Sequence, residues 1–277
     1  MDPIAFKIGG FPIYWYGILI AGGFLCGLWT ASRRAALDHL DSKAISDLGV
    51  WIIIGALVGS RVLYVFTNWD NYSGKSLLEW INFREGGLVF YGGFIGAALA
   101  VVLFSFTRPT ESLWKIADAL APSIPLGHAL GRLGCLMYGC CFGSTCDLPW
   151  AVQFPLGSPA YSMHNSLGLL AGNDVHSLHV HPSQVYAALL NFALYGGLAW
   201  LYRRKCFDGQ VFGVYLVVYS INRFVIEFFR GDYQLEQMWA GWIKPGQQLS
   251  LLLLPVGLVL LGLLSRRKAY KQDSEGS

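Results

Sequence analysis

Long apolar segments dominate this sequence, near residues 13–31, 47–67, 88–107, 116–137, 183–202, 211–229 and 248–264. A helix needs about 20 apolar residues to cross the hydrocarbon core of a bilayer, which is the length of each segment. Hydrophobic residues make up 54% of the 277, and charged residues 13%, about half the share in soluble proteins. These values exclude an ordinary soluble globule, a disordered chain and a nucleic-acid binder. We therefore expect an all-α polytopic membrane protein with about seven transmembrane helices.

The distribution of lysine and arginine predicts the orientation of these helices. Basic residues follow the first, third and fifth segments and recur in the C-terminal tail, whereas residues 138–182 contain none. Because cytoplasmic loops are enriched in lysine and arginine, the N-terminus is expected outside and the C-terminus inside. The expected organisation is one integral membrane domain over residues 1–277, with an outer loop region at about 138–182 and a short cytoplasmic tail at about 265–277. Only Lys7 precedes the first apolar run, so this run is expected to remain as an anchor and not as a cleaved signal peptide.

Three arginines, Arg61, Arg132 and Arg223, fall within or at the ends of apolar segments. An arginine at the bilayer centre costs from about 3 to more than about 10 kcal/mol, so each needs an anionic partner or a wet cavity. A structural interpretation pairs each with a nearby carboxylate, as Glu227 would pair with Arg223 one helical turn away. The main intramembrane acids are Asp118 and Glu227, so the three cations outnumber them. This imbalance favours an anionic ligand, and a lipid phosphate matches the guanidinium fork.

The segment at 116–137 is the most irregular of the set, because Pro122, Pro125, His128 and Arg132 interrupt it. Broken helices survive in a bilayer only where protein or water lines them, so this segment is a candidate wall of a site. Several glycines surround Arg132 and would let a bent segment present backbone N–H groups to an anion: Gly131, Gly134, Gly139 and Gly143. Isolated glycines elsewhere are better explained by close helix packing.

Four cysteines cluster just beyond Arg132, namely Cys135, Cys140, Cys141 and Cys146. Their spacing is not that of paired C-x-x-C motifs, so zinc is weakly supported. A disulfide on the outer side and burial as small apolar residues are equally good alternatives. The histidines of the loop region, His176, His179 and His181, are best interpreted as polar loop residues. The sequence therefore predicts neither a metal ion nor another cofactor.

Several stretches occur in an order and spacing that are specific to one protein family. They are WYGILIAG, GSRVLYV, EGGLVFYGGFIGA, the GRLG of ALGRLGCLMYG, HPSQVY, NRFVIEFFRGD and GQQLS, and they extend from Trp15 to Ser250. With these stretches the chain resembles the prolipoprotein diacylglyceryl transferases.

The resemblance implies a seven-span fold in the bacterial inner membrane, with a site open to the outer leaflet and its membrane lipids. It also implies transfer of the diacylglyceryl group of phosphatidylglycerol to the lipobox cysteine thiol in the signal peptide of a prolipoprotein. By position, Arg132 and Arg223 match the essential arginines of the family. Further positions of the pattern become substrate-binding candidates: Tyr16, Arg61, Gly143, His181, Gln184, Glu227, Arg230 and Gln247.

The chain departs from the family pattern at two places. Tyr91 stands where the family often has a histidine proposed as the base, and Cys135, Tyr138 and Cys140 replace Asn, Asn and Glu. His128 lies four residues before Arg132, on the same face of a helix. We therefore expect His128 or Tyr91 to orient or deprotonate the acceptor thiol.

Two other functions are compatible with the buried arginines. A related membrane transferase or lipid hydrolase would keep the lipid site and use a different acceptor, and the cysteines near Arg132 motivate that alternative. An anion or lipid transporter would use the same arginines without chemistry. Transporters of this kind have inverted repeats or paired broken helices, whereas this sequence has one broken segment.

Overall fold

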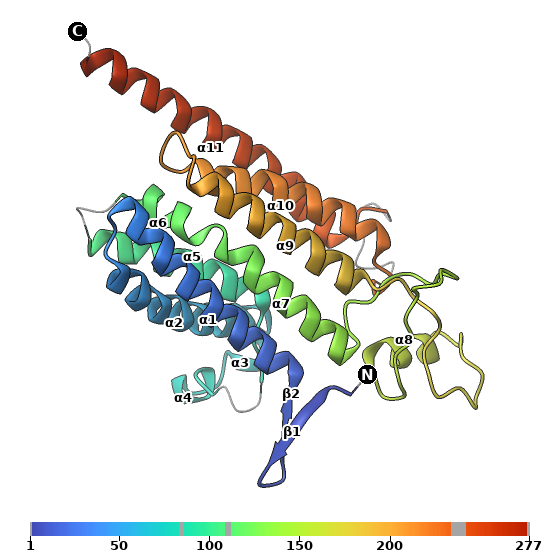
Figure 1. Ribbon diagram of the computed structural model, residues 1–277. Helices are drawn as coiled ribbons and strands as arrows, with labels where there is room; N and C mark the ends of the chain where they lie inside the picture. The colour runs from blue at the N-terminus through green and yellow to red at the C-terminus, as the bar shows by residue number, and fades with distance from the viewer. Residues whose placement is uncertain (1, 83–85, 109–111, 234–241, 276–277) are drawn as a thin grey trace. The chain divides into compact units, whose positions relative to one another are not determined.

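The computed structural model describes residues 2–82, 86–108, 112–233 and 242–275, and these are mostly helical (Figure 1). Within them, five helical segments are long and apolar enough to cross a membrane: Trp15–Asp38, Ser42–Thr67, Ser183–Tyr202, Gln210–Phe229 and Pro245–Arg267. A shorter apolar helix covers Tyr91–Phe106. The expectation of an all-α multi-pass membrane protein is confirmed at this level.

The chain divides into two compact units, one formed by Met1–Thr30 with Ala117–Ser277 and the other by Ala31–Ile116. The first unit holds most of α1 (Trp15–Ala35), the end of α6 (Leu113–Leu120), and α7 (Ser123–Tyr138), α8 (Pro159–Ser166), α9 (Ser183–Tyr202), α10 (Gln210–Phe229) and α11 (Pro245–Glu275). Helix α9 packs against both α7 and α10, and α10 packs against α11, so these four helices lie side by side (Figure 1).

The predicted break in the fourth apolar segment lies at Ala121 and Pro122, between α6 and α7. The start of α7 is attached to α1, because the Ser123 hydroxyl donates to the Gly27 carbonyl over 2.6 Å. Near this contact the backbones of Gly23 and Gly127 approach closely, since a Cβ on Gly23 would lie 3.2 Å from the Gly127 Cα. Small residues thus let the two helices meet, as is common in membranes.

Asp118, on α6, is fully buried and fixes the start of α10. Its carboxylate lies 3.1 Å from the Lys205 ammonium and accepts from the N–H groups of Gly209 and Phe212 at 2.9 and 3.0 Å. This acid is therefore already neutralised and caps a helix N-terminus.

The second unit contains η1 (Ala36–Asp38), α2 (Ser42–Thr67), α3 (Trp69–Tyr72), α4 (Leu77–Trp80) and α5 (Phe90–Phe106). Helices α2 and α5 pack through Gly55 and Gly59 on one side and Gly92 and Gly96 on the other. An added Cβ at any of these four positions would collide with the facing helix. Packing through small residues is thus confirmed for these glycines.

Three features were not indicated by the sequence patterns. An antiparallel hairpin of β1 (Ile4–Ile8) and β2 (Phe11–Tyr14) precedes α1. Helix α11 continues through Glu275, beyond the expected start of the tail near residue 265. The loop region has a small core of its own, formed by Phe142, Phe154, Ala160 and Val180.

Candidate functional site

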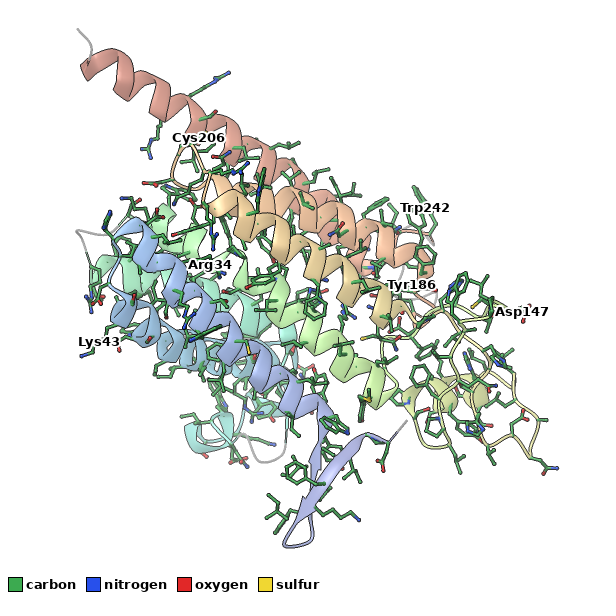
Figure 2. All side chains as sticks on the ribbon, viewed as in Figure 1. Arg34, Lys43, Asp147, Tyr186, Cys206 and Trp242 are labelled. Carbon is green, nitrogen blue, oxygen red and sulfur yellow. The ribbon has the colours of Figure 1, made fainter. Side chains whose placement is uncertain are left out.

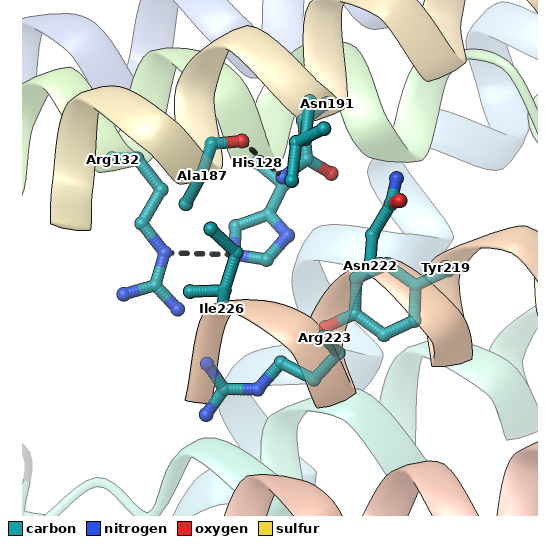
Figure 3. A pocket seen from close by; sticks show the side chains of 9 residues that line it. His128, Arg132, Ala187, Asn191, Tyr219, Asn222, Arg223 and Ile226 are labelled. Carbon is teal, nitrogen blue, oxygen red and sulfur yellow. Dashed lines mark hydrogen bonds between the residues drawn. The ribbon is translucent and has the colours of Figure 1, made fainter. Parts of the chain in front are cut away.

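Helix α7 presents His128 and Arg132 on one face, one turn apart. The Arg132 Nε–H donates to His128 Nε2 over 3.0 Å (Figure 3). In this geometry the imidazole nitrogen accepts a hydrogen bond from the guanidinium. His128 thus orients the Arg132 guanidinium.

A small pocket lies among α7, α9 and α10. It is lined by His128, Arg132, Ala187, Leu190, Asn191, Tyr219, Asn222, Arg223 and Ile226. Figure 3 shows the guanidinium groups of Arg132 and Arg223 extending to the same side of the pocket from different helices. The structure therefore brings together two of the three arginines that the sequence singled out, the two that match the essential arginines of the resemblance.

Asn191 adds an unused hydrogen-bond acceptor to this pocket. Its Nδ2 donates to the Ala187 carbonyl over 2.7 Å, and the residue is 5% exposed. Its Oδ1 is buried and has no hydrogen-bond partner among the described residues. A buried acceptor without a partner costs about 1–3 kcal/mol, so this atom favours a ligand that carries a donor such as a hydroxyl.

Arg223 has the carboxylate partner that the sequence predicted. Its Nη1 lies 3.0 Å from Glu227 Oε2, and Glu227 is fully buried. The other carboxylate oxygen accepts from the Gly246 N–H over 3.2 Å. A Cβ on Gly246 would lie 2.6 Å from both the Arg223 Nη2 and the Glu227 carboxyl carbon, so the close approach of α11 requires glycine there.

Arg230 is also paired with an acid. Its Nε and Nη2 donate to the two oxygens of Asp232 over 2.7 and 2.6 Å, the bidentate geometry that gives strong ion pairs. The guanidinium also lies 4.9 Å from the centre of the Tyr233 ring. In this arrangement Arg230 is neutralised.

Arg132 differs from both. In residues 2–82, 86–108, 112–233 and 242–275, no carboxylate lies within ion-pair distance of its guanidinium. Arg132 and Arg223 thus both line the pocket, and of these two only Arg223 has a carboxylate partner, Glu227, among the described residues. An excess of positive charge in a pocket favours an anion, and a phosphate matches the guanidinium geometry.

The loop that follows α7 is held against α9 and α10 by predicted site residues. The Gly143 N–H donates to the His181 carbonyl and the His181 N–H to the Ser144 carbonyl, each over 3.0 Å. A Cβ on Gly143 would lie 2.5 Å from the His181 carbonyl oxygen, so only glycine fits. The buried Gln184 donates to the Cys140 carbonyl over 2.8 Å. These residues shape the site by fixing the loop.

Tyr16 and Gln247 lie at helix ends. Tyr16, at the start of α1, is 42% exposed and packs beside Gly134 and Tyr138 of α7. Gln247 is buried, and its Oε1 accepts from the Lys244 N–H over 3.0 Å at the start of α11. Tyr186, in the first turn of α9, accepts a hydrogen bond from the Trp150 indole over 2.7 Å; Figure 2 labels Tyr186 and, on the loop that carries Trp150, Asp147.

Arg61 and Tyr91 belong to the second compact unit. Arg61 is 4% exposed, and its nitrogens donate to backbone carbonyls of Trp80, Glu79 and Gly86 over 2.6, 3.0 and 2.9 Å. It therefore stabilises the segment between α2 and α5. Tyr91, near the start of α5, is 51% exposed.

The cysteines near Arg132 form a cluster that their spacing did not predict. All six cysteines are free thiols, and the sulfurs of Cys135, Cys140 and Cys141 lie within 4.8 Å of one another. The chain reverses direction after α7, because Gly139 and Cys141 adopt left-handed conformations with φ of 80° and 58°. Hydrogen bonds from Cys135 and Cys140 and the charges of Arg230 and Arg132 lower the pKa of the Cys141 thiol. The left-handed conformation of Cys141 costs about 1–2 kcal/mol, so the surrounding contacts must hold this loop in place.

These features define a helical, multi-pass membrane protein with a pocket among its helices that two arginines line. The model of one family, described as prolipoprotein diacylglyceryl transferase, matches residues 3–263. The chain belongs to this family, as the sequence motifs indicated.

Curated relatives extend over the whole chain. The phosphatidylglycerol–prolipoprotein diacylglyceryl transferase of Finegoldia magna is 32% identical over 276 residues, covering 99% of this chain and 100% of the relative. The enzymes of the same name from Pseudoalteromonas translucida and Bacillus cereus are each 33% identical, and each alignment covers 99% of this chain and 95% of the relative. The likeness is therefore to complete transferases.

Proposed function

We propose that this protein transfers the diacylglyceryl group of phosphatidylglycerol to the lipobox cysteine thiol of prolipoproteins, the first step of lipoprotein maturation in the bacterial inner membrane. The family match over residues 3–263 supports the reaction class. Within the structure, the observation that carries the proposal is Arg132, which shares a pocket with Arg223 and has no carboxylate partner among the described residues.

The proposed topology has about seven membrane crossings, with the N-terminus outside and the C-terminus inside. The broken pair α6 and α7 and the shorter helix α5 would add two crossings to the five long apolar segments. Residues 138–182, which lack lysine and arginine, would lie on the outer side, and residues from about 265 onward on the cytoplasmic side. All of these belong to one integral membrane domain.

The pocket suggests how the donor lipid is held. The Nη groups of Arg132 and Arg223 would bind the phosphate oxygens, with His128 orienting the first guanidinium and Glu227 the second. The unpartnered Oδ1 of Asn191 would accept from a hydroxyl of the glycerol headgroup. Gly143, His181, Gln184, Arg230 and Gln247 would hold the surrounding loops and helix ends, and Tyr16 would lie at the start of α1 beside α7.

In the reaction, the acceptor sulfur attacks the glyceryl carbon that is bonded to the phosphate oxygen. A C–S bond forms, the C–O bond breaks, and glycerol 1-phosphate leaves with the electron pair. Negative charge increases on the phosphate as it leaves, and arginines fixed beside it stabilise that charge. Because a phosphate monoester is already a good leaving group, positioning and electrostatics supply much of the rate.

A transferase or hydrolase with another acceptor is the second candidate. Cys135, Tyr138 and Cys140 occupy positions where the family commonly has Asn, Asn and Glu, and two of these residues join the thiol cluster beside Arg132. A change of residue chemistry next to the reacting groups favours a change in how the acceptor is handled.

One reconstitution separates the two candidates. The purified protein is incubated with phosphatidylglycerol and a peptide that carries a lipobox cysteine, and both products are measured by mass spectrometry. The proposal expects a diacylglyceryl mass gain on the peptide and an equal amount of glycerol 1-phosphate. The matched peptide with serine in place of that cysteine should gain nothing. Glycerol 1-phosphate released with no gain on the cysteine peptide would establish the second candidate.

A further inference from the structure

Three thiols lie together beside the arginine that has no carboxylate partner, and the proposed mechanism uses none of them. Cys135 lies in the last turn of α7, whereas Cys140 and Cys141 follow the reversal of the chain at Gly139. The reversal is closed by hydrogen bonds from the N–H groups of Gly139 and Cys140 to the Cys135 carbonyl, over 2.9 and 3.2 Å. It returns two sulfurs to within 4.8 Å of the first.

Buried side chains of α9 hold the backbone that carries these sulfurs. The Ser183 hydroxyl donates to the Cys141 carbonyl and the Gln184 amide to the Cys140 carbonyl, each over 2.8 Å. Both residues are at most 1% exposed. These hydrogen bonds fix the backbone of the cluster, so rotation of the cysteine side chains is enough to change the distances between the sulfurs.

We propose that Cys135, Cys140 and Cys141 bind Zn²⁺ as three thiolates and leave a fourth coordination position for the acceptor thiol. Zinc–sulfur bonds of about 2.3 Å in a tetrahedron require sulfurs about 3.8 Å apart, and the three sulfurs already lie within 4.8 Å of one another. Three sulfur ligands select zinc over the hard cations that prefer oxygen. The acceptor part of this inference rests on the proposed function, whereas the zinc site does not.

Charge balance supports three thiolates at this place. A Zn²⁺ ion with three cysteine thiolates carries one net negative charge. Arg132 and Arg230 are close enough to act electrostatically on Cys141, and Arg132 acts on Cys135 as well. Asp232 already pairs with Arg230, so the positive charge of Arg132, which also faces the pocket, would stabilise the negatively charged zinc centre without a neutralising carboxylate among the described residues.

An open coordination position on this zinc ion would activate the acceptor thiol, and the described side chains provide few groups that could act as a base for it. The Nε2 of His128 is engaged by Arg132, and the family's histidine is replaced by Tyr91. A thiol bound to Zn²⁺ is deprotonated and its proton passes to water. The zinc-bound sulfur then attacks the glyceryl carbon as the C–O bond to phosphate breaks, and the oxidation state of the metal does not change. Zinc sites with three protein ligands keep such a position for substrate.

The zinc site is tested first by metal content. Protein purified in detergent without chelator should contain about one equivalent of zinc by plasma mass spectrometry. Changing Cys135, Cys140 or Cys141 to serine should lower the affinity for Zn²⁺ by more than about 100-fold. Cys146→Ser, in the same loop, and Cys206→Ser, at the far end of α9 (Figure 2), are matched controls that should retain the ion. Wild-type protein without zinc, with copper in its place, or with a disulfide within the cluster would overturn the site.

The open position is tested by replacing zinc with Co²⁺, whose thiolate charge-transfer absorption reports the number of sulfur ligands. Adding the lipobox peptide should increase this absorption by about one third, since three thiolates become four. The serine peptide should change nothing. An unchanged spectrum with the cysteine peptide would refute the acceptor role.

A pH profile connects the site to turnover. A free thiol ionises near pH 8.5, so chelated enzyme should lose activity below that pH, and zinc should move the midpoint down by at least about one unit. Identical profiles with and without zinc would refute activation by the metal. The two proposals fail separately: zinc bound without peptide modification contradicts the transferase, and peptide modification by wild-type protein that contains no zinc when purified without chelator contradicts this site.

Discussion

Three arginines of this protein lie in apolar helices, and their guanidinium groups find different hydrogen-bond and ion-pair partners. Arg61, in the second compact unit, donates to the carbonyls of Glu79, Trp80 and Gly86. Arg132, in the first, donates through Nε to His128 and has no carboxylate partner among the described residues. Arg223 is intermediate, since it shares the pocket of Arg132 and pairs with Glu227.

The comparison shows that the burial of an arginine does not by itself identify a ligand site. A guanidinium that donates hydrogen bonds to backbone carbonyls stabilises the fold, so its removal is expected to lower stability. A guanidinium with free donors beside a pocket is available to a ligand, so its removal is expected to affect activity. Three experiments test this distinction in order of decreasing expected effect, and a fourth, with the smallest effect, tests the loop region.

Arg132→Ala should lower peptide diacylglyceryl transfer by about 10³-fold, or about 4 kcal/mol of barrier, because it removes the phosphate donor with the least competition from protein groups. Arg132→Lys should recover little, since an ammonium does not form the bidentate contact. Turnover is measured with the lipobox peptide, and the exposed Arg266→Ala serves as the control. A rate for Arg132→Ala within about tenfold of wild type would contradict the assignment of Arg132 to ligand binding.

Arg223→Ala should lower both activity and stability. It leaves the buried Glu227 carboxylate without its partner, which costs about 3–5 kcal/mol. The double variant Arg223→Ala/Glu227→Gln removes that charge and keeps an oxygen for the Gly246 N–H, so it should recover most of the stability and none of the activity. Thermal unfolding in detergent and peptide turnover provide the two readouts. Recovery of activity in the double variant would show that Arg223 acts only on the fold.

Arg61→Ala should destabilise the second unit by about 2–3 kcal/mol, because several buried carbonyls lose their donor. Limited proteolysis between α2 and α5, read by mass spectrometry, should accelerate, and Arg61→Lys should recover part of the protection. Arg108→Ala is the control, since its exposed ion pair with Asp41, at 3.6 Å, contributes about 1 kcal/mol at most. Equal effects of the two alanine variants would contradict the role assigned to Arg61.

The sequence predicted those features that depend on local spacing. Apolar length located the long helices, two prolines located the break before α7, and the four-residue separation of Arg223 and Glu227 predicted their ion pair. Each of these follows from helix geometry and from the thickness of the bilayer.

The sequence patterns did not predict features that depend on how loops and turns bring residues of the chain together in space. The carbonyls around Arg61 come from a segment 18 to 26 residues away, and no periodicity brings them there. The spacing of Cys135, Cys140 and Cys141 resembles no zinc motif, because their convergence depends on left-handed conformations at Gly139 and Cys141. The glycine after a helix was a visible signal for the turn, but not for the second left-handed residue.

His164 tests whether the loop region responds to pH independently of the arginines. Burial lowers its pKa, and its Nδ1 accepts from the Leu178 N–H over 3.2 Å, so the folded loop favours the neutral imidazole. The unfolded loop binds more protons below about pH 6.5, and stability must therefore fall as the pH decreases through that value. A single proton limits the change to about tenfold in the opening equilibrium per pH unit, the smallest effect of the four. His164→Asn keeps an acceptor near the position of Nδ1 and does not titrate, so proteolysis of residues 139–182 should lose this pH dependence in the variant. The same acid-induced increase in His164→Asn would place the sensitivity elsewhere in the loop.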